Sequence, residues 1–441
     1  MSFKKNFAQT GLTHAVVFVF GFAMSILNAR FLGPEGVGML VLLELLKAFS
    51  INISDLGFGR SLRYYSANGE IHFLILKKII VQVGILLGFI VVLISLLLKN
   101  LPLGVWNEID NLLYLAYLPT IFCLVLVNYY RHLLHGQLQI TAVNISQILE
   151  RVFYIILFLA FVWLFDLGLF GAVISLTIST FLLLLMLFLK TRKYSLEFER
   201  SHSQNLKKSL KLIWGYGKWT YYSTFINYFV EKLPVFLLKS FGSTFAVIGY
   251  FSKAQGLANY PRIAAVPFSG LLFSYNAGSN IDSAITRTDT MCRLTFWAIN
   301  ILFITLGLFI KPIITILYGK EFLPAAEFFF YLYPSVIFYI QTLYLTSFLG
   351  ARGLNKKNFM VKMRSFPFIV VLIYFLIKYL GGIGTAISIS ATFAILWFQY
   401  AIVYFKLSNS SFKRILLLYK SDITLIYSLL LKLKSKLKTR N

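Results

Sequence analysis

The chain has 441 residues, of which 58% are hydrophobic and only 13% are charged, whereas an ordinary soluble domain carries about 25% charged residues. The formal net charge of +26 would suggest nucleic acid as a partner of a soluble protein. Here most basic residues lie in short connections between apolar runs, as in multi-pass membrane proteins. The composition therefore excludes a soluble nucleic-acid-binding domain and predicts contact with membrane lipids instead.

Apolar runs of membrane-spanning length occupy most of the chain. A hydrocarbon core of ~30 Å needs about 20 apolar residues per helix, and on that basis we predict an all-α membrane protein with about twelve transmembrane helices. Six lie on each side of a basic segment at residues 190–213. The first six are expected near residues 12–31, 38–56, 79–98, 111–130, 145–165 and 169–189, and the second six near residues 214–238, 244–273, 294–317, 326–349, 366–380 and 383–404.

The basic residues predict which way the spans face. Lys and Arg resist translocation, so connections rich in them stay on the cytoplasmic side. With the N-terminus inside, the inner connections and the C-terminal tail carry 30 Lys or Arg, and the outer connections and outer span ends carry six. This bias places both termini in the cytoplasm.

The two halves of the chain resemble each other. FLGPEGVGMLVLLELLKA in the first half is similar to SFGSTFAVIGYFSKAQGLA in the second, so that Gly38 and Gly249 differ by 211 positions. Later in the halves, Gly171 and Gly384 differ by 213 positions. Because six is an even number of spans, the halves point the same way, related by a pseudo-two-fold axis along the membrane normal. Many secondary transporters have this arrangement, with the substrate between the halves.

The tail alternates apolar clusters with basic residues, which is typical of an amphipathic helix lying on the inner leaflet. A thirteenth span is the alternative. The expected parts are an N-terminal six-helix lobe at residues 1–189, a cytoplasmic basic linker at 190–213, a C-terminal six-helix lobe at 214–405 and a basic amphipathic cytoplasmic tail at 406–441.

Several segments resemble a known family. ARFLGPEGVGML followed by SDLGFGRSLRYYSA looks like the start of bacterial polysaccharide flippases. These belong to the superfamily that also holds multidrug and toxic-compound extruders and the peptidoglycan-precursor flippase. EKLPVFLLKSFGSTFAVIGYFSKAQGLANYP is similar to the family's seventh-to-eighth span segment, and SFLGARGLNKKNF and GGIGTAISIS are similar to its tenth-to-twelfth spans. The resemblance covers about the first 405 residues.

This resemblance implies an alternating-access carrier in the bacterial cytoplasmic (inner) membrane. Its expected cargo is an undecaprenyl-pyrophosphate-linked oligosaccharide, moved from the inner to the outer leaflet for O-antigen, capsule or exopolysaccharide synthesis. Family members commonly carry cationic residues in the central cavity. Membrane lipids and the polysaccharide polymerase machinery are the candidate partners that follow, and nucleic acid is not among them.

Charged residues inside predicted spans are the candidate site, because a charge at mid-membrane costs ~2.5–3.5 kcal/mol on insertion scales. Lys253 has no acidic residue three or four positions away, which predicts a cavity that binds an anion. Glu44 and Lys47 share a helix face; they form either a structural pair or an ion-coupling group with a substrate-binding one. Arg262 either reaches substrate phosphate or snorkels to headgroups. Gln255 occupies the repeat position of Glu44 and completes the predicted substrate-binding set.

Other residues bear on gating and energy supply. Asp55 with Arg60 and Arg63 is expected at an inner gate or a headgroup contact. His132 and His135 lack further ligands, so no metal site is predicted. No nucleotide-binding or cofactor motif is found in the sequence, which leaves an ion gradient, with Glu44 as the titrating group, as the expected energy source.

Two other function classes compete with the flippase. A drug/cation antiporter on the same fold would want net acidic charge in its cavity, whereas this chain offers lysines. A membrane polymerase or ligase of lipid-linked sugars would need a large outer loop with catalytic residues. The longest predicted outer connections, at residues 101–111 and 318–326, are short, so we expect a protein that is not an enzyme.

Overall fold

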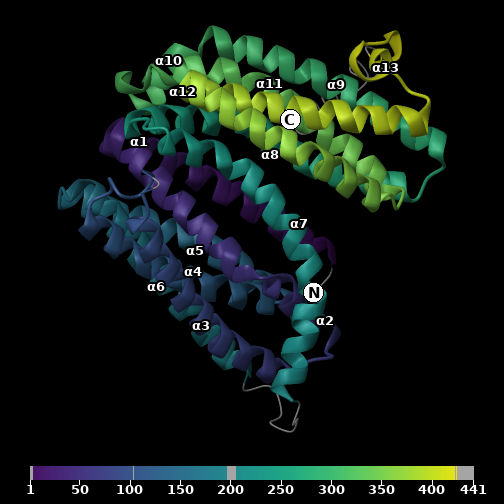
Figure 1. Cartoon of the computed structure of the whole chain (residues 1–441). Helices are drawn as coiled ribbons and strands as arrows, with labels where there is room; N and C mark the ends of the chain where they lie inside the picture. Colours follow the sequence, from purple (N-terminus) through teal and green to yellow (C-terminus); the bar gives the residue numbers. More distant parts are fainter. Residues whose placement is uncertain (1–2, 103, 196–204, 423, 425–441) are drawn as a thin grey trace, which may run out of the picture. The chain divides into compact units, whose positions relative to one another are not determined.

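The computed structural model describes residues 3–102, 104–195, 205–422 and 424, and over that part of the chain the regular structure is entirely helical (Figure 1). The helices in the first part of the chain are α1 (Phe3–Asp55), α2 (Phe58–Asn68), α3 (Phe73–Asn100), α4 (Asn111–Gly136), α5 (Ile140–Phe158) with a π-helical turn at Leu159–Leu164, α6 (Gly168–Ser195) and α7 (Leu206–Ser240). The remaining helices are α8 (Phe245–Ala277), α9 (Ile281–Leu308), α10 (Ile310–Tyr318), a short 3₁₀ helix (Lys320–Phe322), α11 (Ala325–Ala351), α12 (Asn355–Ser408) and α13 (Phe412–Leu416).

The helix lengths account for twelve membrane crossings. Among the described residues, eight helices are long and apolar enough to cross a membrane. Two of them, α1 and α12, are double spans, because each contains a left-handed glycine that breaks the helix, Gly33 (φ 64°) and Gly381 (φ 54°). Glycine suits this conformation because it has no Cβ. With the 35-residue α7 and the 33-residue α8, the predicted architecture of about twelve helices is confirmed.

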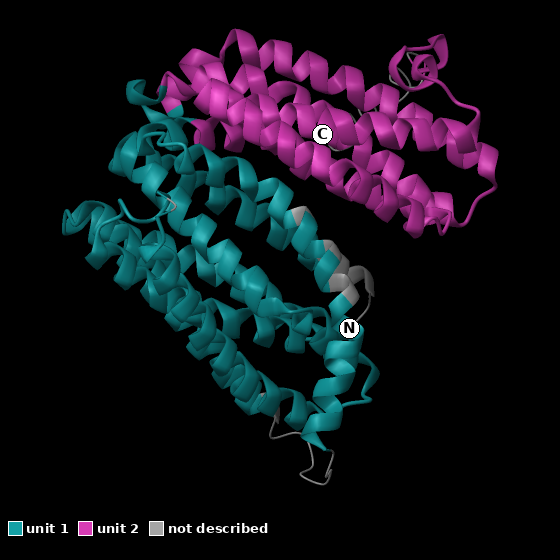
Figure 2. Ribbon diagram, viewed as in Figure 1, with its two compact units in different colours: residues 1–250, 317–322 teal, residues 251–316, 323–441 magenta. Residues whose placement is uncertain are grey.

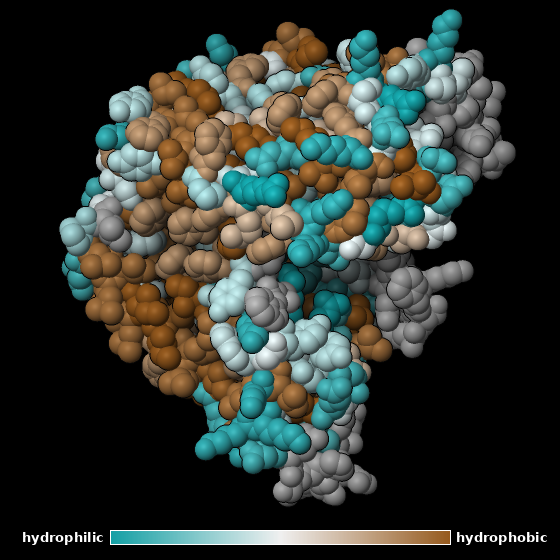
Figure 3. Space-filling model, turned by 45° about the vertical axis from the view of Figure 1, so that its right-hand side comes forward, coloured by the Kyte–Doolittle hydropathy of each residue, from teal (hydrophilic) through white to brown (hydrophobic). Residues whose placement is uncertain are grey.

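Exposed apolar side chains mark the lipid-facing surface. On α3, Leu86, Phe89, Leu93 and Leu97 are each more than half exposed and recur at helical spacing. Broad hydrophobic areas of the same kind are visible in Figure 3. A soluble protein rarely exposes such large apolar patches, so the chain is a multi-pass membrane protein.

The chain forms two compact units (Figure 2). Unit 1 comprises residues 1–250 and 317–322, and unit 2 comprises residues 251–316 and 323–441. Helix α7 packs with unit 1 through α2: the Ser61 hydroxyl donates to the Ile213 carbonyl at 2.8 Å. The two six-helix lobes expected from the internal repeat have other boundaries than these compact units. The lobes were defined by sequence similarity between the halves, and they stay a prediction.

The core of unit 1 surrounds α4, which packs against α3 and α6. The Tyr114 hydroxyl on α4 donates to the Ser95 carbonyl on α3 at 2.6 Å. The hydroxyls of Thr120 on α4 and Thr177 on α6 are 2.8 Å apart. Buried hydroxyls without a partner are costly in an apolar setting, so these bonds define how the helices are rotated against one another.

The core of unit 2 is formed by α11, which packs along α12 and α9. The Ser335 N–H on α11 donates to the Ser390 hydroxyl on α12 at 3.2 Å. On the α9 side, the rings of Phe303 and Phe329 stack with centroids 4.8 Å apart. Unit 2 is thus held by aromatic packing and by polar contacts of α11 with both neighbouring helices.

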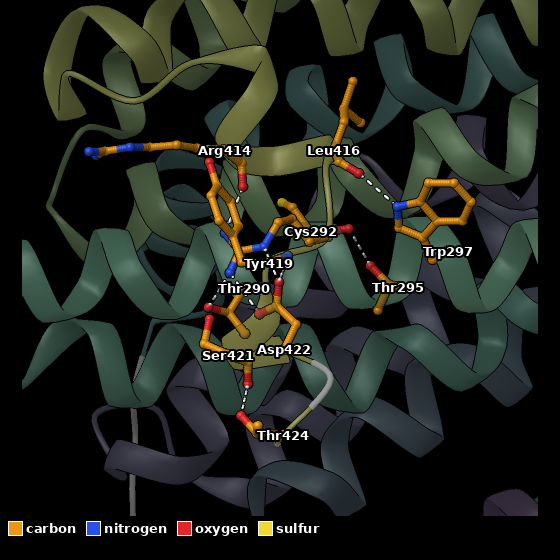
Figure 4. Close-up of polar contacts among 11 residues, drawn as sticks. Thr290, Cys292, Thr295, Trp297, Arg414, Leu416, Tyr419, Ser421, Asp422 and Thr424 are labelled. Atoms are coloured by element: carbon orange, nitrogen blue, oxygen red, sulfur yellow. Dashed lines mark hydrogen bonds and ion pairs between the residues drawn. The ribbon is translucent and has the colours of Figure 1, made fainter. Parts of the chain in front are cut away.

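The segment after α12 folds back onto α9, as Figure 4 shows. The Arg293 guanidinium on α9 donates two hydrogen bonds to the Asp422 carboxylate, at 2.7 and 2.8 Å, and a third to the Arg414 carbonyl at 2.7 Å. Within the described residues this part of the tail is the short helix α13 and turns, and no thirteenth span occurs. Residues 425–441 of the expected amphipathic tail lie outside the described residues.

Replacing Asp422 by Asn is expected to weaken the docking of this segment by about 3 kcal/mol, because the buried Arg293 guanidinium then loses its bonded carboxylate and keeps only a more distant electrostatic interaction with Asp289. The Arg293 hydrogen bonds hold the pKa of Asp422 below its usual value of 3.8. A lowered folded pKa contributes stability that is fully present above about pH 4 and is lost as the pH falls through the lower folded value. A spin label at Ser421 should therefore be immobile in the native chain and mobile in the Asp422→Asn variant at pH 7, with the two spectra converging in acid. Equal mobility at pH 7 would contradict the expected role of the ion pair.

Candidate functional site

The predicted pair on the second part of α1 forms: the Lys47 ammonium and the Glu44 carboxylate make an ion pair one helical turn apart. The Glu44 side chain is 46% exposed and the Lys47 side chain 23% exposed. Leu42, Leu43, Leu45 and Leu46, which flank the pair, are buried. The pair therefore lies on an accessible face of this part of the helix, where water can solvate it.

Three further charged residues extend this pair, and none of them is among the predicted site residues. Arg131 on α4 donates to Glu150 on α5 at 2.7 Å and to the Ser146 hydroxyl at 3.0 Å. Glu150 interacts electrostatically with Arg131, Arg151 and Lys47. A charged cluster on α1, α4 and α5 thus combines three basic and two acidic residues. The sequence feature that could have identified this cluster is the adjacent pair of charged residues Glu150 and Arg151, early in a predicted span.

Tyrosines surround Glu44 from three helices. Tyr117 on α4, Tyr154 on α5 and Tyr228 on α7 each interact with its charge. The Tyr154 hydroxyl also donates to the Asn28 side chain at 3.4 Å. The Tyr117 and Tyr228 hydroxyls are buried and have no hydrogen-bond partner within the described part of the chain. A carboxylate among such hydroxyls can hold a proton or a hydrated cation.

Breaking the Arg131–Glu150 pair is expected to destabilise unit 1. Glu150→Gln should lower the free energy of unfolding by about 1–3 kcal/mol, because the half-buried guanidinium loses a charge-assisted hydrogen bond. Arg131→Met should cost a similar amount, and the double variant should cost less than the sum of the two. Thermal unfolding in detergent measures this cycle. Strictly additive shifts would show that the two residues do not act as a pair.

The predicted substrate-binding residues of the second half lie on α8 in unit 2. Lys253 is 6% exposed, and Gln255 is half-buried. A lysine ammonium at this depth, near the middle of a span, is costly. The burial agrees with a shielded position for Lys253, and its role in binding an anion stays a prediction.

Arg262 is built into the packing of unit 2. Its guanidinium donates to the Ser335 hydroxyl at 2.9 Å and lies 4.6 and 4.5 Å from the ring centroids of Tyr339 and Phe393. Cation–π contacts of this kind stabilise a desolvated guanidinium by about 2 kcal/mol. These contacts tie α8 to α11 and α12, and the substrate-binding role of Arg262 stays a prediction.

The three residues predicted at an inner gate gather around α2. The Asp55 carboxylate accepts from the Gly59 N–H at 3.0 Å, so it caps the start of α2. Arg60 is exposed and donates to the Thr224 hydroxyl on α7 at 3.4 Å. Arg63 is exposed and interacts electrostatically with His132 and His135 on α4. This end of unit 1 thus presents cations to solvent. No cluster suited to a metal ion occurs among the described residues.

Repeat-related glycines meet where α1 crosses the start of α8, within unit 1. A Cβ on Gly38 would overlap the Phe245 carbonyl, and a Cβ on Gly249 would overlap the Pro34 carbonyl. Pro34 and Phe245 differ by 211 positions, as do Gly38 and Gly249. Each half therefore offers the same two positions to the other, as in a two-fold symmetric interface, which supports the repeat register read from the sequence.

An ion pair lies beside this crossing. The Lys239 ammonium, which is 2% exposed, is 2.5 Å from the Glu108 carboxylate and 4.1 Å from the ring centroid of Phe245. The indole N–H of Trp106 in the same connection donates to the Leu42 carbonyl on α1 at 3.1 Å. The connection between α3 and α4 thus ties α1 to α7. Backbone contact at the crossing leaves no path between α1 and α8 at this point.

Comparison with known proteins relates this architecture to characterised folds. The sequence family "Polysaccharide biosynthesis protein" matches residues 3–273. The lipid II flippase MurJ in an inward closed conformation is 15% identical, with a TM-score of 0.69 over 96% of this chain and 92% of that one. An inward-facing multidrug resistance MATE family transporter is also 15% identical, with a TM-score of 0.65 over 90% of this chain and 96% of that one.

A third solved structure is a MOP superfamily transporter from Pyrococcus furiosus, described as having a binding pocket of reverse polarity. It is 16% identical, with a TM-score of 0.60 over 93% of this chain and 96% of that one. No curated protein sequence matches the chain. At these identities the structural likeness shows the fold, that of the MOP superfamily.

Proposed function

Because this chain belongs to the polysaccharide biosynthesis protein family and has the fold of MOP superfamily transporters, we propose that it is a flippase for lipid-linked sugars. Its cargo is an undecaprenyl-pyrophosphate-linked oligosaccharide repeat unit, moved from the inner to the outer leaflet for surface polysaccharide synthesis. The observation that carries this proposal is the buried lysine on α8, Lys253.

The charge of the cargo explains why cations are needed. A pyrophosphate must cross a ~30 Å apolar layer while it carries negative charge. Fixed positive groups offset its desolvation, because their interaction is stronger in a shielded site than in water. Lys253 and Arg262 in unit 2 and Lys47 in unit 1 supply these groups, and Arg131 joins them in the cluster of unit 1. Gln255 offers hydrogen bonds to the sugar or phosphate oxygens.

The geometry around Glu44 supports coupling to an ion gradient. Lys47 neutralises Glu44 in part, and the Tyr117 and Tyr228 hydroxyls are available to a proton or a hydrated cation beside it. Uptake or release of that ion resets the carrier. Transport in vesicles should therefore slow when the proton and sodium gradients are both abolished, and an unchanged rate would rule out this coupling.

The orientation follows from the distribution of basic residues. Both termini lie in the cytoplasm, and the protein lies in the bacterial cytoplasmic membrane. The exposed cations Arg60 and Arg63, with Asp55 at the start of α2, then face the inner leaflet, where the cargo is loaded. The polysaccharide polymerase machinery receives the cargo on the other side.

The experiment that tests the proposal is transport by the purified full-length protein in proteoliposomes. Undecaprenyl-pyrophosphate-linked oligosaccharide is placed in the outer leaflet of the vesicle. Its movement to the inner leaflet is measured as protection of the sugar from a glycosidase added outside. The proposal expects protection that depends on the protein and on the pyrophosphate, with undecaprenol-linked sugar as the neutral control. Transport of cationic drugs without movement of lipid-linked sugar would indicate the antiporter instead.

A further inference from the structure

The segment after α12, residues 409–422, is a built part of unit 2, and we name it the C-terminal strap. Besides the Arg293–Asp422 contact, the Trp297 indole N–H on α9 donates to the Leu416 carbonyl at 2.8 Å (Figure 4). The Ser410 hydroxyl donates to the Asp289 carboxylate at 2.9 Å. Three separate points on α9 therefore hold the strap.

Apolar packing completes the attachment. Ile415 is fully buried, and the ring of Phe412 lies against Phe405 and Trp397 on α12, with centroids 4.7 and 5.6 Å away. Arg293 lies 4.8 Å from the ring centroid of Tyr419. One side of the strap is thus packed against the helices of unit 2.

The other side of the strap has a different composition. Leu417 is 53% exposed, and Leu418 and Tyr419 are 40% and 43% exposed. The basic residues Lys413, Arg414 and Lys420 are exposed as well. Asp422 is the only acidic residue of the strap, and Arg293 neutralises it. The accessible side therefore combines apolar residues with positive charge, although Arg414 also interacts electrostatically with the Asp289 carboxylate on α9.

The position of the strap identifies what this surface meets. It begins directly after α12, a helix that crosses the membrane, so it lies at the depth of the lipid headgroups. Apolar and aromatic residues flanked by Lys and Arg are typical of segments that bind an anionic membrane surface. We propose that the C-terminal strap binds the anionic phospholipid headgroups of the leaflet at the Ser408 end of α12. Residues 425–441 add five Lys or Arg and no acid, which extends the charge complementarity.

In this arrangement Leu417, Leu418 and Tyr419 enter the interface between headgroups and acyl chains, while Lys413, Arg414 and Lys420 bind phosphates. Each basic residue near an anionic surface contributes roughly a fivefold gain in partitioning. The surface is independent of the proposed cargo site, because it needs neither Lys253 nor transport.

The test uses the full-length protein in single-chain nanodiscs. The two native cysteines, which are buried, are replaced by Ala, and a fluorophore sensitive to its environment is attached through Leu417→Cys. Emission is recorded in nanodiscs of phosphatidylcholine alone and of phosphatidylcholine with phosphatidylglycerol. We expect a blue shift in the anionic nanodiscs. Salt at 1 M should reverse it, because the screening length is then about 3 Å and the attraction between the basic residues and the headgroups is largely screened.

Two triple variants separate the strap from general surface charge. Lys413→Gln, Arg414→Gln and Lys420→Gln together should remove the blue shift. The matched control replaces three exposed basic residues of α12 in the same unit, Lys356, Lys357 and Arg364, by Gln and should keep it.

Three results would overturn the proposal. They are equal emission in neutral and anionic nanodiscs, a blue shift that survives the strap variant, and a blue shift that appears in neutral nanodiscs when a second preparation holds two chains per disc. The last would identify a second copy of the chain as the partner. Size-exclusion profiles of each variant show whether the protein is folded, and the emission readout does not depend on transport activity.

Discussion

Lys253→Ala is expected to abolish surface polysaccharide while the protein still inserts in the membrane at normal levels. The buried ammonium is the group proposed to offset the charge of the crossing pyrophosphate. Removing one partner of a desolvated charge pair costs about 3 kcal/mol, or roughly a hundredfold in transport rate. Complementation of a flippase-null strain measures the polysaccharide, with membrane abundance measured alongside.

Three companion variants show whether charge or packing is responsible. Lys253→Arg should be partly tolerated, because charge matters more than the shape of the donor group. Lys253→Met keeps the length of the side chain without its charge; it should be inactive and, since a buried charge is removed, at least as stable. Lys356→Ala, an exposed lysine of unit 2, is the control and should be fully active. Full polysaccharide from Lys253→Ala would remove the chemical argument for the cargo site.

Gly249→Val is expected to stop transport for a different reason, by preventing α1 and α8 from closing against each other. The added side chain would overlap the backbone carbonyl of Pro34, and backbone atoms cannot turn aside as a side chain can. Overpacking costs typically 1–3 kcal/mol, and at about 3 kcal/mol it shifts the balance between the closed and open crossing roughly a hundredfold. Gly38 meets Phe245 in the equivalent way, so Gly38→Val should have the same effect.

The accessibility of a thiol shows whether the crossing of α1 and α8 is closed or open. Val37, beside Gly38, is 3% exposed, and Val37→Cys should react with a membrane-impermeant thiol reagent only when the crossing opens. In the Gly249→Val background it should react readily. Gly256→Ala is the matched control on α8, because a Cβ at that position meets nothing within 4 Å and alanine favours the helix. An unreactive Val37→Cys in the Gly249→Val background would show that this crossing is not a gate.

The number and type of the elements could be predicted from the sequence. In a bilayer each backbone N–H and C=O must be satisfied within its own helix, so the length of an apolar run is sufficient to predict a span. The breaks inside α1 and α12 also have a local cause, because each occurs at a glycine that adopts a left-handed conformation, Gly33 and Gly381. The repeat offset at Gly38 and Gly249 was also visible in the sequence, and so was the close pairing of Glu44 with Lys47, one helical turn away.

Contacts between helices were decided only by the tertiary structure. Arg131 lies just beyond the predicted end of a span, and its pairing with Glu150 depends on how far α4 continues and how α5 is rotated. Arg293 and Asp422 are 129 positions apart, and no local pattern relates them. Backbone hydrogen bonds within one helix join residues four positions apart, so they can be predicted from the sequence. The rotation of one helix against the next depends on the packing of many distant side chains together, and that packing determined which charges meet.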